Sequence, residues 1–112
     1  MKMHRPLFAA AVVLVALGAA AGVSAADLAA GKAKATEICA ACHGADGNSA
    51  TADFPRIGGQ YPDYLAKALR DYKSGQRKNA IMAGFAQALS KQDVENLTAY
   101  YAAQPATVSA KH

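Results

Sequence analysis

The strongest constraint on this chain is a five-residue segment that carries both of its cysteines. Cys39 and Cys42 are separated by two alanines, and His43 follows directly, in the order Cys-Ala-Ala-Cys-His. Two thiols and an imidazole this close together can hold one cofactor or metal ion from the same side. The rest of the chain therefore has to fold around whatever this segment binds.

Four chemistries use a cysteine pair with this spacing. A thioredoxin-like redox site expects alternating strands and helices, and no segment here alternates like a strand. A structural zinc site needs four ligands, but beyond residue 26 only the two thiols, His43 and the terminal His112 are of the right type. A disulfide suits an oxidising compartment but leaves His43 without a role. Attachment of heme, with both thiols added to its vinyl groups and His43 on the iron, uses all three side chains.

The first 26 residues have the composition of an export signal. Lys2 and Arg5 precede an uncharged stretch rich in Ala, Val and Leu, and small residues fill the positions just before Asp27. This order predicts a secretory signal peptide over residues 1–26, with a retained membrane anchor as the alternative. Heme of the c type is attached outside the bacterial cytoplasm, so the leader and the heme motif together predict a periplasmic protein.

Cleavage would leave 86 of the 112 residues, enough for one small domain over 27–104 and a flexible tail over 105–112. A chain this short builds a limited apolar core and benefits from a cofactor at its centre. Two of the twelve basic residues lie in the leader, which leaves ten against eight acidic residues, a net charge of +2. Two heme propionates would bring this charge close to zero, so nothing indicates a nucleic-acid partner.

Three segments carry the apolar periodicity of helices. The first begins after Asp27, the second runs from Pro62 to Gly75, and the third begins at Ser90, which resembles a capping box with Asp93. The expected apolar positions are Leu28, Gly31, Ala35 and Ile38 in the first, Tyr61, Leu65, Ala68, Leu69 and Tyr72 in the second, and Val94, Leu97, Tyr100 and Tyr101 in the third.

Long loops separate these helices, and such loops are reasonable if they wrap a cofactor. Residues 76–88 are expected to be irregular or briefly helical, with Met82 in a loop. Met82 is the only methionine left once Met1 and Met3 are removed with the leader. Because chiefly His, Met, Cys and Tyr bind heme iron, Met82 is predicted as the second ligand, opposite His43. A Tyr ligand is the main competitor, and filling a gap in the core is the alternative role for Met82.

Basic residues are concentrated around the second expected helix. We interpret them as a solvated face, helped by i,i+4 pairing of Asp63 with Lys67, in preference to a docking patch for acidic partners. These basic residues are Lys67, Arg70, Lys73, Arg77 and Lys78.

The sequence resembles the class I cytochrome c family over essentially the whole chain after the leader. The segment 39–44 resembles the heme motif of that family, and Gly31, Leu97 and Tyr100 match the place where its first and last helices cross. The resemblance implies an all-α cytochrome c fold, with three main helices and long loops wrapped around one covalent heme. Within the class, the chain is similar to small bacterial respiratory cytochromes with one heme, and to one half of the two-heme relatives.

The same resemblance implies roles for Pro55 and Ile57. Pro55 lies twelve residues after His43, the spacing at which the family's proline carbonyl accepts the N–H of the iron-ligating imidazole. Such a bond orients the ring and makes it a stronger donor. Ile57 matches an aliphatic residue packed on the heme. The predicted heme-binding residues are therefore Cys39, Cys42, His43, Pro55, Ile57 and Met82, with His43 and Met82 as the metal ligands.

The resulting functional prediction is an electron-transfer protein, not an enzyme: a soluble periplasmic carrier of respiratory electron transport that uses one His/Met-ligated heme c. Its expected partners are redox proteins, a donor and a terminal oxidase or reductase. We expect a monomer or weak dimer, without stable membrane insertion if the leader is cleaved. Three alternatives stay open: a heme enzyme or gas-binding protein with an open iron position, a thiol–disulfide protein, and an electron-carrying subunit of a larger complex.

Overall fold

The structure is a computed structural model that describes residues 2–4, 10–12 and 25–107. The predicted signal peptide, 1–26, lies mostly outside the described residues, and so does the end of the predicted tail, 108–112. The described part of the chain is all-helical and contains no strand, as the sequence predicts. None of the helices in these described ranges is long and apolar enough to span a membrane.

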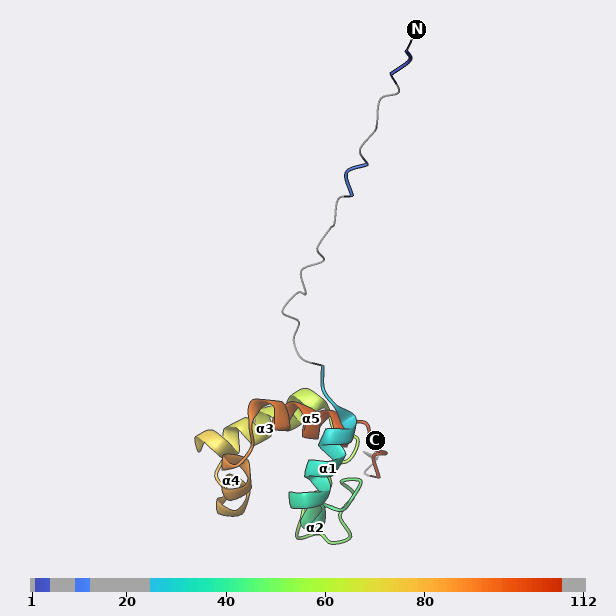
Figure 1. Cartoon of the computed structure of the whole chain (residues 1–112). Helices are drawn as coiled ribbons and strands as arrows, with labels where there is room; N and C mark the ends of the chain where they lie inside the picture. The colour runs from blue at the N-terminus through green and yellow to red at the C-terminus, as the bar shows by residue number, and fades with distance from the viewer. Residues whose placement is uncertain (1, 5–9, 13–24, 108–112) are drawn as a thin grey trace, which may run out of the picture.

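Five helical segments make up the domain: α1 (Leu28–Ile38), α2 (Ala40–His43), α3 (Pro62–Ser74), α4 (Ala80–Gln87) and α5 (Lys91–Ala102). The first, third and fifth are the predicted main helices. α2 and α1 pack together, α1 packs on α5, α5 on α3, and α3 on α4. Figure 1 shows the resulting arch, with α2 at the end of one leg and α4 in the other.

The helix ends follow the predicted local signals. Asp27 accepts a hydrogen bond from Ala30 N at 3.0 Å and so caps α1. Pro62 occupies the first turn of α3, and Gly75 ends that helix with φ of +84°. Glycine adopts this left-handed conformation without the strain that a side chain would add.

The start of α5 is held by the predicted capping box. Ser90 Oγ accepts from Asp93 N at 3.0 Å, and the Asp93 carboxylate accepts from Ser90 N at 3.0 Å. The second bond lowers the pKa of Asp93 from its usual 3.8. The stabilisation from this carboxylate is therefore present above pH 3.8 and is lost as the pH falls through the lowered pKa.

Ser90→Ala is expected to lower the free energy of unfolding of the holoprotein by about 1 kcal/mol, because one N–H at the start of α5 loses its partner. Denaturant titration at neutral pH measures this change. Thr36→Ala, in the exposed face of α1, is the control and should be neutral or slightly stabilising, since Ala favours helix more than Thr. An unfolding midpoint for Ser90→Ala equal to that of the control would contradict the prediction.

α1 and α5 approach each other closely at Gly31. A Cβ built on Gly31 would lie 2.2 Å from the backbone oxygen of Asn96 and 3.0 Å from Cβ of Tyr100. Asn96 Oδ1 also accepts from Asp27 N at 2.9 Å and from Gln92 Nε2 at 2.8 Å, which ties the start of α1 to α5. The crossing therefore requires a residue without a side chain at position 31.

The first residues of the predicted tail contact the rest of the domain. Asn48 Nδ2 donates to Pro105 O at 2.8 Å, and Asn48 Oδ1 accepts from Thr107 N at 3.2 Å. Arg56 Nη1 donates to Thr107 Oγ1 at 3.1 Å. The segment after α5 is therefore joined to the loop between α2 and α3.

Three expectations about individual side chains are wrong. Leu28 is 52% exposed and Tyr61 is 79% exposed, because each stands at the very start of its helix, before the turns that pack on a neighbour. Lys67 pairs with Asp71 in place of Asp63. Asp63 lies in the first turn of α3, where free helix N–H groups already stabilise a carboxylate.

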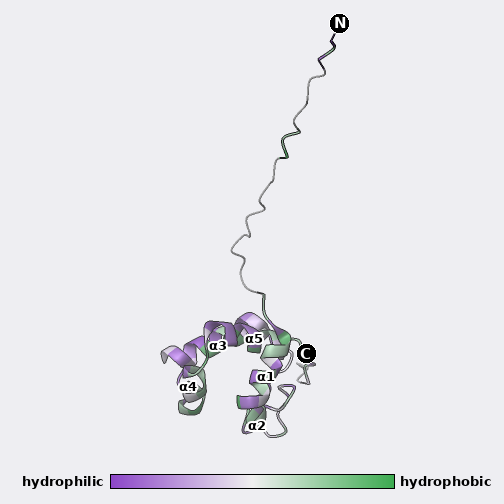
Figure 2. Ribbon diagram, in the orientation of Figure 1, coloured by the Kyte–Doolittle hydropathy of each residue, from purple (hydrophilic) through white to green (hydrophobic). Residues whose placement is uncertain are grey.

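The buried core is small and is drawn from four helices and from Leu89, between α4 and α5. Figure 2 shows hydrophilic residues over much of α3 and apolar residues over much of α4. The buried apolar residues are Ala35, Leu65, Ala86, Leu89, Val94, Leu97 and Tyr101. Four of these side chains, Leu65, Leu89, Leu97 and Tyr101, line a cavity.

Candidate heme site

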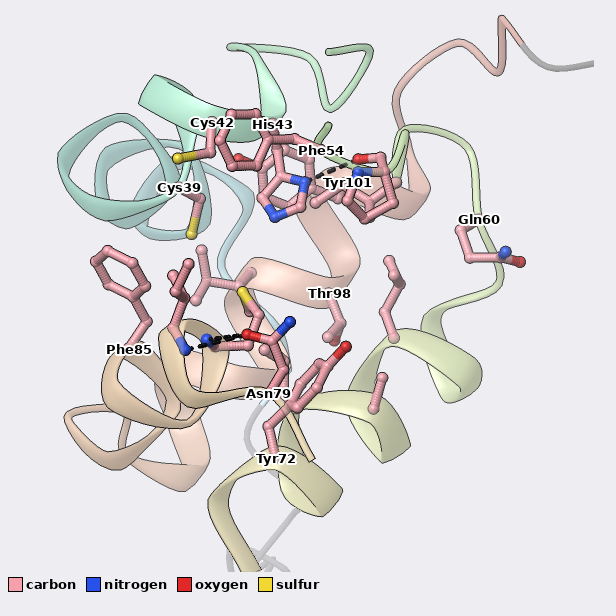
Figure 3. Close-up of a pocket in the computed structure, with 18 of the residues that line it drawn as sticks. Cys39, Cys42, His43, Phe54, Gln60, Tyr72, Asn79, Phe85, Thr98 and Tyr101 are labelled. Atoms are coloured by element: carbon pink, nitrogen blue, oxygen red, sulfur yellow. Dashed lines mark hydrogen bonds between the residues drawn. The ribbon is translucent and has the colours of Figure 1, made fainter. Parts of the chain in front are cut away.

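A cavity of about 330 Å³ opens between the two legs of the arch. Its apolar lining includes the side chains of Leu65, Leu69, Phe85 and Leu97. The structure brings all six predicted heme-binding residues to this cavity: Cys39, Cys42, His43, Pro55, Ile57 and Met82. Figure 3 shows Cys39, Cys42 and His43 on one side of it, with Phe85, Asn79 and Tyr72 on the other.

The two thiols belong to a single helical turn. Cys39 caps α2 and Cys42 lies within it, so both side chains and His43 leave the same short segment. Both thiols are free, and burial raises the pKa of Cys39. Thiol–disulfide sites depend on a lowered cysteine pKa and, in thioredoxin-like proteins, on strands that the described chain lacks. The raised pKa of Cys39 and the absence of strands in the described residues do not match a thioredoxin-like site.

The His43 ring is held in one orientation. His43 is 9% exposed, and its Nδ1 lies 2.8 Å from Pro55 O. Because a carbonyl oxygen can only accept, Nδ1 carries a proton, and in the neutral imidazole the lone pair is then on Nε2. Phe54 packs edge-on against the ring, with centroids 6.5 Å apart. In this tautomer, His43 has an unprotonated nitrogen available to a metal ion. The bond to Pro55 fixes the orientation of the ring.

Met82 lies in helix α4 and not in a loop as expected. Asn79 Oδ1 accepts from Ile81 N and from Met82 N, both at 3.0 Å, and so caps the helix. An Asn directly before a short apolar run is a helix-start signal that sequence reasoning could have used. Asn79 therefore sets the backbone at Met82, and it lines the cavity as well.

The other end of α4 is joined to α3. Gln87 Nε2 donates to Lys73 O, and Lys73 Nζ donates to Leu89 O, both at 2.7 Å. Ala86 and Leu89 are buried beside these bonds. Through α3, α4 is held at the far end of the arch from α2, so Met82 and His43 approach the cavity from opposite legs.

Arg77 was predicted, like Lys73, to belong to a solvated basic face. Both side chains instead contact other residues of the domain. Arg77 Nη1 donates to the Tyr64 hydroxyl at 3.3 Å, and its guanidinium stacks 5.0 Å from the centre of the Tyr72 ring. These contacts raise the pKa of Arg77, chiefly through the Tyr64 bond. Arg77 lines the cavity and is therefore part of the site.

Tyr101 lines the cavity. The sequence predicted it only as an apolar position of the last helix and gave no role to its hydroxyl. It is 3% exposed, and its hydroxyl has no hydrogen-bond partner among the described residues. The neighbouring Cys39 thiol is only a weak acceptor. Burial raises the pKa of Tyr101 well above its usual range, so the hydroxyl keeps its proton in the cavity. A buried hydroxyl without a partner is costly, and it suits a cavity that a ligand with polar groups fills.

A sequence model of the family described as "Cytochrome c" matches residues 28–103. The chain belongs to the cytochrome c family. It is 46% identical over 84 residues to cytochrome c4 of Thiocapsa roseopersicina, a match that covers 75% of this chain and 43% of that protein. It is 41% identical over 81 residues to cytochrome c-554(548) of Halomonas halodenitrificans, covering 70% of this chain and 96% of that protein.

A solved structure agrees with these sequence matches. Reduced recombinant cytochrome c4 from Pseudomonas stutzeri superposes with a TM-score of 0.69 at 41% identity, over 75% of this chain and 48% of that one. The chain therefore spans about half the length of the cytochrome c4 relatives that it matches.

Membership of the cytochrome c family brings a covalently bound heme c and its iron, and the cavity fits this group. One wall offers two free thiols and an imidazole lone pair, the opposite leg offers a thioether, and apolar side chains surround the space between them. The matched residues, 28–103, thus form a cytochrome c domain.

Proposed function

We propose that this cytochrome c is an exported electron carrier whose heme c is attached to Cys39 and Cys42, with His43 and Met82 as the axial iron ligands. The observation that carries the proposal is the packing order of the helices. It directs the imidazole from α2 and the thioether from α4 into the same cavity from opposite legs of the arch. Bound heme c supplies a one-electron couple between ferric and ferrous iron.

The surrounding residues determine how this site works. If His43 and Met82 both held the iron, no iron position would be left for a substrate, and the same two side chains would serve both oxidation states. The soft thioether of Met82 favours ferrous iron and raises the reduction potential. The bond from His43 to Pro55 acts in the opposite direction, since it makes the imidazole a stronger donor. Leu65 and Leu97 help to exclude water.

Periplasmic location is part of the proposal. It is supported by the basic, apolar and small-residue order of residues 1–26 and by the need for heme c to be attached outside the cytoplasm. The expected partners are redox proteins of a respiratory chain, which this carrier meets as a monomer or weak dimer.

Met82→Ala tests the axial assignment. The oxidised wild-type holoprotein should show the weak red-region band of sulfur bound to ferric iron, and the variant should lose it completely. The reduced variant should also bind carbon monoxide readily at neutral pH, because one iron position becomes open. Both properties are measured by optical spectroscopy.

Ile81→Ala is the matched control for this experiment, since Ile81 precedes Met82 in α4 and is 63% exposed. It should keep the band and should not bind carbon monoxide. If wild type and Met82→Ala have the same spectrum, the assignment of Met82 is wrong. Ready binding of carbon monoxide to the reduced wild type would favour the alternative of an open iron position.

A further inference from the structure

We propose that Ser49 is a positioning residue for the hydrogen bond between Pro55 and His43. Pro55 has no N–H group, so its own backbone cannot anchor it as a donor. The position of its carbonyl depends on the residues at either side, and both of them are hydrogen-bonded to Ser49. The inference rests on the proposed role of His43 as an iron ligand.

Ser49 reaches the Pro55 segment from both sides. Its Oγ donates to Phe54 O at 2.5 Å, with Thr51 O as a second acceptor at 3.0 Å. Its own carbonyl accepts from Arg56 Nε at 3.4 Å. One residue therefore contacts the neighbour before Pro55 and the neighbour after it.

The Ser49 side chain is deeply buried. Ser49 is 2% exposed, which makes it one of the most buried side chains of the domain even though it lies in a loop. Loss of the hydroxyl would remove the donor that Phe54 O has here, and a part-buried carbonyl that loses its donor is destabilised. The burial of this polar side chain in a loop is explained by its hydrogen bonds to the segment around Pro55.

The base of the loop is fixed independently of Ser49. Ile57 N and Gly58 N both donate to Gly47 O, at 2.7 and 3.0 Å. These two bonds join the ends of the loop that contains Ser49 and Pro55. Asn48 joins the same base to the segment after α5, as described above. With the base held in this way, the bond from Ser49 to Phe54 O restrains the Phe54–Pro55 peptide. The next peptide, Pro55–Arg56, carries the carbonyl that faces His43, and the fixed φ of Pro55 joins the two.

Removal of the Ser49 hydroxyl should weaken the His43–Pro55 bond without removing either partner. A weaker bond at Nδ1 makes the imidazole a poorer donor at Nε2. Ferric iron depends on that donation more than ferrous iron does, so the reduced state should be favoured and the reduction potential should rise.

The test uses the holoprotein of Ser49→Ala, compared with wild type. In the reduced protein, NMR should show that the His43 Nδ1–H exchanges with solvent about tenfold faster, because its acceptor is less well placed. The reduction potential should rise by up to about 59 mV, which is a tenfold change in the one-electron equilibrium.

Two variants serve as controls. Ser74→Ala removes an exposed hydroxyl that also bonds a backbone carbonyl, and it should leave exchange and potential unchanged. Ser49→Thr keeps the hydroxyl and should restore most of the wild-type values. If Ser49→Ala yields too little holoprotein, Ser49→Cys, with a similar size and a weaker donor, should show the same shifts.

The proposal is overturned if Ser49→Ala or Ser49→Cys lowers stability yet keeps the wild-type exchange rate and potential, since Ser49 would then be structural only. A failure of the underlying ligand assignment looks different. It would appear in wild type as His43 resonances without the ring-current shift of a heme ligand, or in Met82→Ala as an unchanged spectrum.

Discussion

Gly31→Ala is expected to destabilise this cytochrome c by about 3 kcal/mol or more, a large share of the 5–15 kcal/mol that typically stabilises a domain. The added Cβ would lie 2.2 Å from Asn96 O, and a backbone atom cannot rotate away as a side chain can. α1 would have to move off α5, which stretches the bond from Asp27 to Asn96. Thermal or denaturant unfolding of the holoprotein measures the loss.

Gly84→Ala provides a control with the same chemical change. Gly84 also lies inside a helix, α4, but a Cβ built on it has nothing within 4 Å. This variant should gain roughly 0.5–1 kcal/mol, because Ala loses less backbone freedom on folding than Gly. Equal destabilisation by the two substitutions would show that the close approach to Asn96 is not the reason for glycine at position 31.

Replacement of both Cys39 and Cys42 by alanine is expected to abolish covalent attachment of heme. Mass spectrometry under denaturing conditions, on protein matured in a competent bacterial host, should find one heme added to the wild-type polypeptide and none in the double variant. Ala41→Ser, an exposed position between the two cysteines, should keep the heme. A wild-type mass equal to that of the bare polypeptide would falsify the assignment of both thiols.

The double variant, purified free of heme, should also fail to form the native core. At about 24 cal/mol per Å³ of unfilled cavity, a space of 330 Å³ corresponds to ~8 kcal/mol, as much as the whole stability of many small domains. We expect no cooperative thermal transition and little near-UV circular dichroism. A sharp transition in the heme-free variant would show that the helices pack stably without the cofactor.

The sequence alone determined those features that act within one helical turn. Asp27 and the Ser90 box mark helix starts correctly because their side chains bond to N–H groups three residues away. Pro62 and Gly75 mark the ends of α3 because of their own backbone preferences. The heme motif is local in the same sense, since its thiols and imidazole share one turn of α2. The resemblance to the cytochrome c family, which the family match confirms, rested on such short motifs.

Tertiary structure decided the features that depend on neighbours far along the chain. α4 has eight residues, too few to be stable alone, so its formation around Met82 depends on packing against α3. The burial of Ser49 and the orphaned hydroxyl of Tyr101 depend on how loops and helices close around the cavity. Residue types suggested His43 and Met82 as the iron ligands that we propose. Only the packing order of the helices places them on opposite legs of the arch, because that order follows from contacts that no local pattern encodes.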